Sequence, residues 1–96
     1  MDNPEVIGGR IRRLRLALGY DQARAFCQFV GFSDQALYNY ETGKRRISLD
    51  EVMKIVTKTG ASLDFIYRGL EHTLPGHVLD KLVEYDRQEQ KKRAAG

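Results

Sequence analysis

The stretch GFSDQALYNYETGKRR, residues 31–46, contains two amide side chains and a run of cations. Gln35 and Asn39 are four residues apart, so they share one face if this segment is helical. Glutamine and asparagine can pair bidentately with adenine in the DNA major groove. Lys44, Arg45 and Arg46 directly follow a glycine and could contact phosphates. We predict nucleic-acid contact, although an ordinary polar helix face followed by a solvated loop would have the same composition.

Two acids and a tyrosine in the same stretch have more than one possible role. Asp34 could accept a hydrogen bond from a cytosine amino group. It could also be a first-turn acid that the helix dipole stabilises, and we favour this second role. Tyr38 could pack on a thymine methyl group or a sugar, or it could lie against the protein itself. Glu41 is a poor partner for phosphates and needs a separate explanation.

The remaining sequence offers no residues for catalysis, and we predict no metal and no cofactor. Cys27 is the single cysteine, and we predict a small, buried and inert side chain. His72 and His77 have no further Cys or His partners for a tetrahedral zinc site. The segment IGGR at residues 7–10 lacks the spacing and the preceding strand of a nucleotide-binding loop.

Composition and charge are typical of one globular domain. The chain has 96 residues, of which 42% are hydrophobic and 30% charged, and its formal net charge is +3. This weak positive charge permits nucleic-acid binding without proving it. A single cysteine allows no internal disulfide and fits a reducing compartment. Neither a signal peptide nor an apolar run of the ~20 residues that span a membrane is evident, so we predict a cytoplasmic protein.

Apolar periodicity and capping residues predict an all-α chain. Ile7, Ile11 and Leu14 recur at helical spacing in the first segment. Ser48 and Glu51 form a capping box at the start of another. Glycines follow most segments and predict where the helices end. The first helix is expected to begin after Asp2 or Asn3, with Pro4 in its first turn and its firm part from about residue 7 to 18, because Gly8 and Gly9 weaken the start. The other expected helices cover roughly residues 22–30, 33–42, 48–59, 62–68 and 76–93.

The second and third expected helices have the pattern of a helix-turn-helix unit. Both are short, and Gly31 lies between them. Glycine allows the left-handed backbone of a tight turn, and Cys27 is small where the helices must pass closely. Leu37 and Tyr40 are expected to anchor the third helix, with Phe32 closing the turn from inside. This arrangement leaves an outward row that would enter a major groove: Asp34, Gln35, Tyr38, Asn39 and Thr42.

Three blocks resemble the Cro/repressor type of helix-turn-helix domain: IGGRIRRLR, GFSDQALYNYETGKRRISLDEVMKI and GASLDFIYRG. They lie within about residues 7–70, in the family's order and spacing. The resemblance implies a lambda-repressor-like five-helix bundle in residues 1–70, a recognition helix at the third position, and a dimer on a palindromic operator. It implies base contacts by Asp34, Gln35, Tyr38 and Asn39. We expect phosphate contacts from Gln22, Ala23, Ser33, Thr42, Lys44, Arg45, Arg46 and Arg12.

The resemblance has one departure and one further implication. The family's usual glutamine at the start of the second helix falls on Ala23, and Gln22 lies one position early. Gln22 could still reach a phosphate from the cap position. The family often buries an arginine of the first helix against a glutamate that ends the third. Here those positions are Arg15 and Glu41, so the resemblance implies that Glu41 faces inward.

Residues 71–96 are expected to form a linker and a sixth, amphipathic helix. Val78, Leu82 and Tyr85 share one face of that helix. This face could pack on its own domain or against a second copy, and we predict a dimer interface.

The leading functional prediction is a sequence-specific regulator of transcription that binds double-stranded DNA. A dimeric repressor of bacterial or phage type would act by occupying its operator. The alternative is an antitoxin or adaptor that uses the same fold, with the C-terminal helix binding a toxin or another partner protein. We expect no enzyme activity and no membrane partner.

Overall fold

The computed structural model describes residues 2–95, and within them every regular element is a helix. The predicted all-α architecture is therefore confirmed. In chain order the elements are α1 (Pro4–Ala17), α2 (Ala23–Val30), α3 (Asp34–Thr42), α4 (Leu49–Thr59), α5 (Leu63–Arg68), the 3-10 turn η1 (Glu71–Thr73) and α6 (Gly76–Ala95).

Serine side chains cap the N-termini of three helices, as the sequence predicts. The hydroxyl oxygens of Ser33, Ser48 and Ser62 accept hydrogen bonds from backbone N–H groups three residues on, at 3.1, 3.3 and 3.0 Å. The first helix begins at Pro4, directly after Asn3, as the sequence predicts, and the Asn3 side chain caps it by accepting from the N–H of Val6 at 2.9 Å. The expected linker after α5 contains one turn of 3-10 helix.

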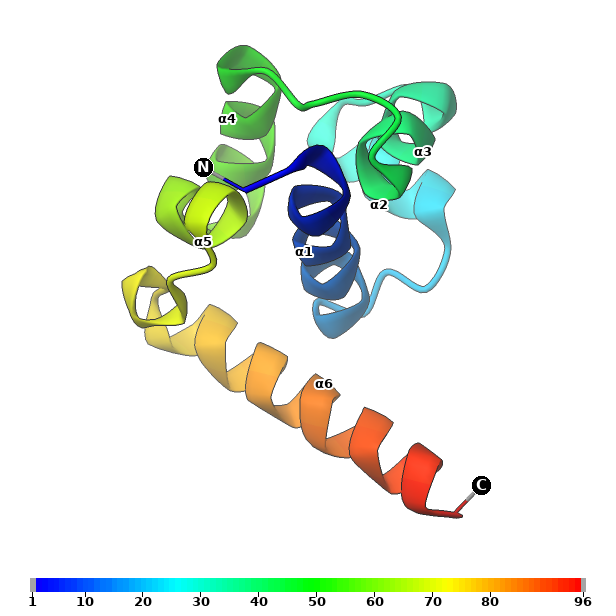
Figure 1. The fold of residues 1–96 in the computed structure, drawn as a ribbon, viewed down its shortest axis with the longest axis vertical. Helices are drawn as coiled ribbons and strands as arrows, with labels where there is room; N and C mark the ends of the chain where they lie inside the picture. Colours follow the sequence, from blue (N-terminus) through cyan, green and yellow to red (C-terminus); the bar gives the residue numbers. More distant parts are fainter. Residues whose placement is uncertain (1, 96) are drawn as a thin grey trace.

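α1 is the central helix of the molecule (Figure 1), and it contacts α3, α5 and α6. Gly8 explains how α1 and α3 come so close. A Cβ atom at this position would lie 2.2 Å from the carbonyl oxygen of Tyr40 and 2.7 Å from that of Glu41. The absent side chain therefore lets the first half of α1 touch the backbone of the last turn of α3.

α6 completes the hydrophobic core of the same chain. Val78 and Leu82 are both fully buried, together with Ile11, Leu14 and Phe65 of the α1–α5 bundle. These two residues are therefore not available to a second copy, and the predicted dimer interface needs correction at both positions. The physical reason is that α6 packs against α1 and shares one hydrophobic core with the bundle. The C-terminal half of α6 extends beyond the globule (Figure 1).

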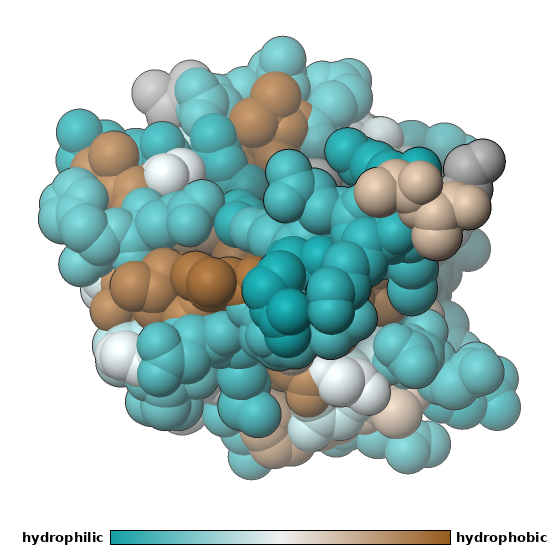
Figure 2. All heavy atoms as spheres, turned by 90° about the horizontal axis from the view of Figure 1, so that it is seen from below, coloured by the Kyte–Doolittle hydropathy of each residue, from teal (hydrophilic) through white to brown (hydrophobic). Residues whose placement is uncertain are grey.

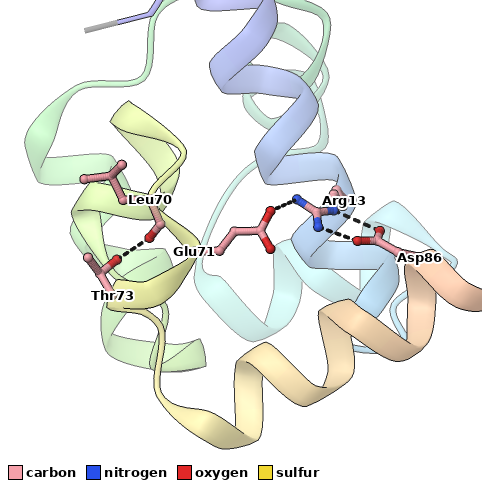
Figure 3. Close-up of polar contacts among 5 residues, drawn as sticks. All are labelled: Arg13, Leu70, Glu71, Thr73 and Asp86. Carbon is pink, nitrogen blue, oxygen red and sulfur yellow. Dashed lines mark hydrogen bonds and ion pairs between the residues drawn. The ribbon is translucent and has the colours of Figure 1, made fainter.

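Arg13 of α1 connects α6 to the bundle through ion pairs (Figure 3). Its Nε donates to Oδ1 of Asp86 at 3.0 Å, and its Nη1 donates to Oε2 of Glu71 at 3.1 Å. The hydrogen bond to Asp86, followed by that to Glu71, raises the pKa of Arg13 above its ordinary value despite partial burial. The charged guanidinium thus joins α1, η1 and α6. Within the η1 segment, the hydroxyl of Thr73 donates to the carbonyl of Leu70 at 2.6 Å and closes the turn.

Candidate nucleic-acid interface

The turn between α2 and α3 depends on one glycine in a left-handed conformation. Gly31 has φ 101°, and its N–H donates to the carbonyl of Cys27 at 2.7 Å. The N–H of Phe32 reaches the same carbonyl at 3.0 Å. Cys27 is buried beneath the turn, and burial raises the pKa of its thiol to about 11. The thiol is therefore neutral, and Cys27 acts as a small packing residue.

The inner face of α3 holds the helix against the core. Leu37 and Tyr40 are buried, and the Tyr40 ring meets Phe32 edge-on with centroids 5.5 Å apart. The opposite face is open to solvent: Gln35 and Tyr38 are exposed, and Asn39 is half-buried. The predicted base-reading side chains therefore lie on the outside of α3.

The two amides of this outer face are bonded to each other. Nε2 of Gln35 donates to Oδ1 of Asn39 at 3.0 Å. The bond leaves the carbonyl oxygen of Gln35 as an acceptor and the amide nitrogen of Asn39 as a donor. One acceptor and one donor side by side match the N6 and N7 edge of adenine.

Cations lie at the end of α3. Nζ of Lys44 is 4.8 Å from the centroid of the exposed Tyr38 ring, a cation–π contact. The backbone N–H of Arg45 donates to the carbonyl of Asn39 at 3.1 Å, which attaches the loop to the helix. Arg46 donates to the carbonyl of Asp2 at 2.9 Å. All three cations remain exposed, and Lys44 is the one in contact with a residue of the outer face of α3.

The uncharged residues that are predicted to contact phosphates differ in the hydrogen-bond donors that they can offer. The Ser33 oxygen accepts from the N–H of Ala36 at 3.1 Å, so its hydroxyl proton remains available. The Thr42 hydroxyl already donates to the carbonyl of Tyr38 at 2.7 Å. Gln22 is exposed at the N-cap of α2 and makes no side-chain cap bond. Ala23, the first residue of α2, can offer only its backbone N–H.

Arg12 lies apart from this group. It lines a groove of about 660 Å³ between α1 and α6, with Arg13, Val83 and Tyr85 among the other lining residues. Its charge acts on Tyr85, where it opposes the rise in pKa that burial causes. The structure therefore groups Arg12 with α6 rather than with the cations that follow α3.

Glu41 faces inward to Arg15, as the resemblance implies. Nε and Nη2 of Arg15 donate to the two carboxylate oxygens of Glu41 at 2.7 and 3.1 Å, and the two side chains are 7% and 11% exposed. Nη1 of Arg15 also donates to the carbonyls of Tyr20 and Asp21, at 2.7 and 3.1 Å. This buried network joins α1, the α1–α2 loop and the end of α3.

The helix-turn-helix family matches residues 11–66, which is more than half of the chain. The chain belongs to this family. The match confirms the family resemblance of the three sequence blocks. α2 and α3 are the two helices of the helix-turn-helix unit. No solved structure matches the chain.

Two relatives of the chain are named as transcriptional regulators. The chain is 32% identical over 71 residues to an "uncharacterized transcriptional regulator in ATPase CF(0) region" of Rhodospirillum rubrum, covering 74% of this chain and 65% of the relative. It is 33% identical over 64 residues to "SPbeta prophage-derived uncharacterized HTH-type transcriptional regulator YonR" of Bacillus subtilis (strain 168), covering 67% and 58%. The chain thus spans less than two thirds of the length of either relative.

The structure adds Arg24 to the residues of the helix-turn-helix surface that the sequence predicts. Arg24 on α2 forms an ion pair with Asp34 on α3, with Nη2 and Oδ2 3.2 Å apart. Neither helix pattern signals this contact, because the two residues meet only once the turn has set the angle between α2 and α3.

Neither a metal site nor a membrane-spanning helix is found among residues 2–95. No group of three or more His, Cys, Asp or Glu side chains is placed to hold a metal ion there. None of the helices described is both long enough and apolar enough to cross a membrane.

Proposed function

We propose that this protein is a non-enzymatic transcriptional regulator that binds double-stranded DNA in a sequence-specific manner. The observation that carries the proposal is the outer face of α3, where Gln35, Tyr38 and Asn39 project and Lys44 lies against the Tyr38 ring. The exposed cations Arg45 and Arg46 follow in the same loop. A recognition helix in the major groove needs uncharged hydrogen-bonding groups for the bases and cations for the backbone. The two relatives named as transcriptional regulators support the same function.

The contacts divide into two sets with different consequences. Gln35 and Asn39 read base edges, and Tyr38 packs against a thymine methyl group or a sugar. Phosphates are contacted by a second group that fixes the position of the domain without reading sequence. Its members are Gln22, the backbone N–H of Ala23, Ser33, Lys44, Arg45 and Arg46.

We propose that the protein acts as a dimeric repressor by occupying a palindromic operator, with its half-sites about 34 Å apart. A second copy would use exposed residues of α6 such as Val83, which is 56% exposed, because Val78 and Leu82 are buried. Figure 2 shows the face seen from below, with apolar patches among hydrophilic residues. Analytical ultracentrifugation on DNA with one or two half-sites tests this mode: one protein per duplex with two half-sites would contradict it.

Binding is expected to weaken steeply with salt, and Arg45→Ala should reduce that dependence. Each phosphate neutralised contributes about −0.9 to the slope of log K against log[salt]. Among residues 2–95 the Arg45 side chain has no hydrogen-bond or ion-pair partner, so its removal should flatten the slope by about one unit per half-site. Fluorescence anisotropy over a salt series measures the slope. Lys58→Ala, which removes an exposed cation of α4, is the control and should leave it unchanged.

Gln35→Ala is expected to relax sequence preference rather than salt dependence. A bidentate amide–adenine contact discriminates by about 1–3 kcal/mol, so preference should fall at one position of each half-site. Competition with operator variants measures this loss. If the substitution weakened binding to every operator variant equally, Gln35 would not read a base.

The competing function is that of an antitoxin or adaptor. It is favoured by the groove between α1 and α6, where Val83 and Leu16 lie among charged side chains. Selection of bound sequences from random double-stranded DNA separates the two functions. An enriched motif supports the regulator, whereas the absence of enrichment would favour a protein-binding module.

A further inference from the structure

An exposed ion pair connects the start of α2 to the start of α3. Nε and Nη2 of Arg24 both donate to Oδ2 of Asp34, at 3.3 and 3.2 Å. The side chains remain 77% and 56% exposed. Ion pairs this exposed contribute little to folding stability, because water screens the charges and ordering the side chains costs entropy. Folding stability therefore does little to explain why this ion pair is present.

The pair leaves one edge of the guanidinium open. Arginine has five N–H donors in a plane, of which Asp34 engages two. Within residues 2–95, Nη1 of Arg24 makes no hydrogen bond, so Nη1 and the second N–H of Nη2 can donate in parallel. Two parallel donors fit O6 and N7 of guanine in the major groove. Because Asp34 already orients the guanidinium, less side-chain entropy is lost when this edge binds.

The position of the pair favours a base rather than a phosphate as its target. Asp34 is the first residue of α3 and directly precedes Gln35. In helix-turn-helix domains the first residues of the recognition helix contact base edges, while the preceding helix crosses the backbone. Asp34 draws the Arg24 side chain from α2 toward this base-reading end. Arg24 in turn neutralises a carboxylate that would otherwise repel nearby phosphates.

We propose that Arg24 reads a guanine in each half-site and that Asp34 is its positioning residue. The inference rests on the proposed function, since it requires the α2–α3 surface to lie on DNA. It gives Asp34 a positioning role in place of direct contact with cytosine, since Arg24 engages Oδ2 of its carboxylate. Arg24 then adds a specificity determinant from α2 to those on α3.

Selection from random double-stranded DNA tests this with the full chain. The wild type should enrich a motif with a guanine at one position of each half-site. For Arg24→Ala the preference for that guanine should fall about 5- to 150-fold, while the rest of the motif is retained. Arg24→Lys should lose the same preference, because an ammonium keeps the charge but not the two parallel donors.

A double-substitution cycle tests the role of Asp34. Asp34→Asn alone should weaken the guanine preference. In the Arg24→Ala background it should change the preference no further, because Asp34 acts only through Arg24. Melting temperatures within a few degrees of the wild type are expected for all variants, since both side chains are exposed.

Four results would overturn the inference, and they differ in what they imply. An unchanged motif with uniformly weaker binding by Arg24→Ala and a salt slope flatter by about one unit would make Arg24 a phosphate contact. A changed motif when Asp34→Asn is added to Arg24→Ala would show that Asp34 reads a base directly. If the wild type enriched no motif at all, the proposed function itself would fail. An enriched wild-type motif that Arg24→Ala leaves intact would reject this inference alone.

Discussion

Arg15→Ala is expected to lower the free energy of unfolding by about 3–5 kcal/mol, because it leaves the carboxylate of Glu41 buried without its partner. The substitution also removes the donor to the carbonyls of Tyr20 and Asp21. For a domain of this size each kcal/mol corresponds to about 4–8 °C in melting temperature, so a decrease of at least ~12 °C should follow. Urea and thermal unfolding monitored by circular dichroism measure both quantities.

Arg24→Ala is the matched control for this prediction. It removes the same type of side chain from an ion pair that is exposed, so its cost should be about 0–1 kcal/mol. A melting temperature of Arg15→Ala within a degree or two of the wild type would mean that the Arg15–Glu41 pair does not hold α3 in place. Loss of DNA binding by a still-folded Arg15→Ala protein would instead assign the pair a role in aligning α3.

Gly8→Ala is expected to destabilise the protein by about 1–3 kcal/mol or more. The new methyl group would lie 2.2 Å from the carbonyl oxygen of Tyr40, and α1 and α3 would have to separate to admit it. Backbone atoms at the end of a helix cannot move aside as a flexible side chain can. Denaturant unfolding curves measure the effect.

The adjacent residue provides the control. Gly9 is also in the interior of α1, and a Cβ atom there would meet nothing within 4 Å. Gly9→Ala should therefore stabilise the protein by about 0.5–1 kcal/mol, because alanine loses less backbone entropy than glycine in a helix. The two variants should thus shift stability in opposite directions. Shifts of the same sign would contradict the close contact between α1 and α3.

Much of the fold could be predicted from local signals. Ser33, Ser48 and Ser62 each cap a helix through a hydrogen bond that spans only three residues. Such contacts, like apolar periodicity, involve residues close together in the sequence, so they can be predicted without knowledge of the tertiary packing. The start of α1 after Asn3 is also predicted, from Pro4 in its first turn, and the helix continues through Gly8 and Gly9 despite their low helix propensity.

The candidate site was only partly predictable. The outward face of α3 follows from helical geometry once Leu37 and Tyr40 are assigned to the core. The pairing of Arg15 with Glu41 came from the resemblance to a family. Arg24 carries no signal of this kind, because its partner is ten residues away on a differently oriented helix. Arg12 was assigned to phosphates from its charge alone, and the structure groups it with α6.

The sequence by itself determined the helices, the turn at Gly31 and the polar row that α3 presents to solvent. Only the tertiary structure decided what α6 covers. Val78 and Leu82 form an apolar face that suits a second copy as well as the same chain, and periodicity cannot distinguish the two. The choice depends on the packing of α6 against α1 and on Arg13, which contacts Asp86 across 73 residues of sequence. Such contacts arise from helix packing, which no stretch of neighbouring residues encodes.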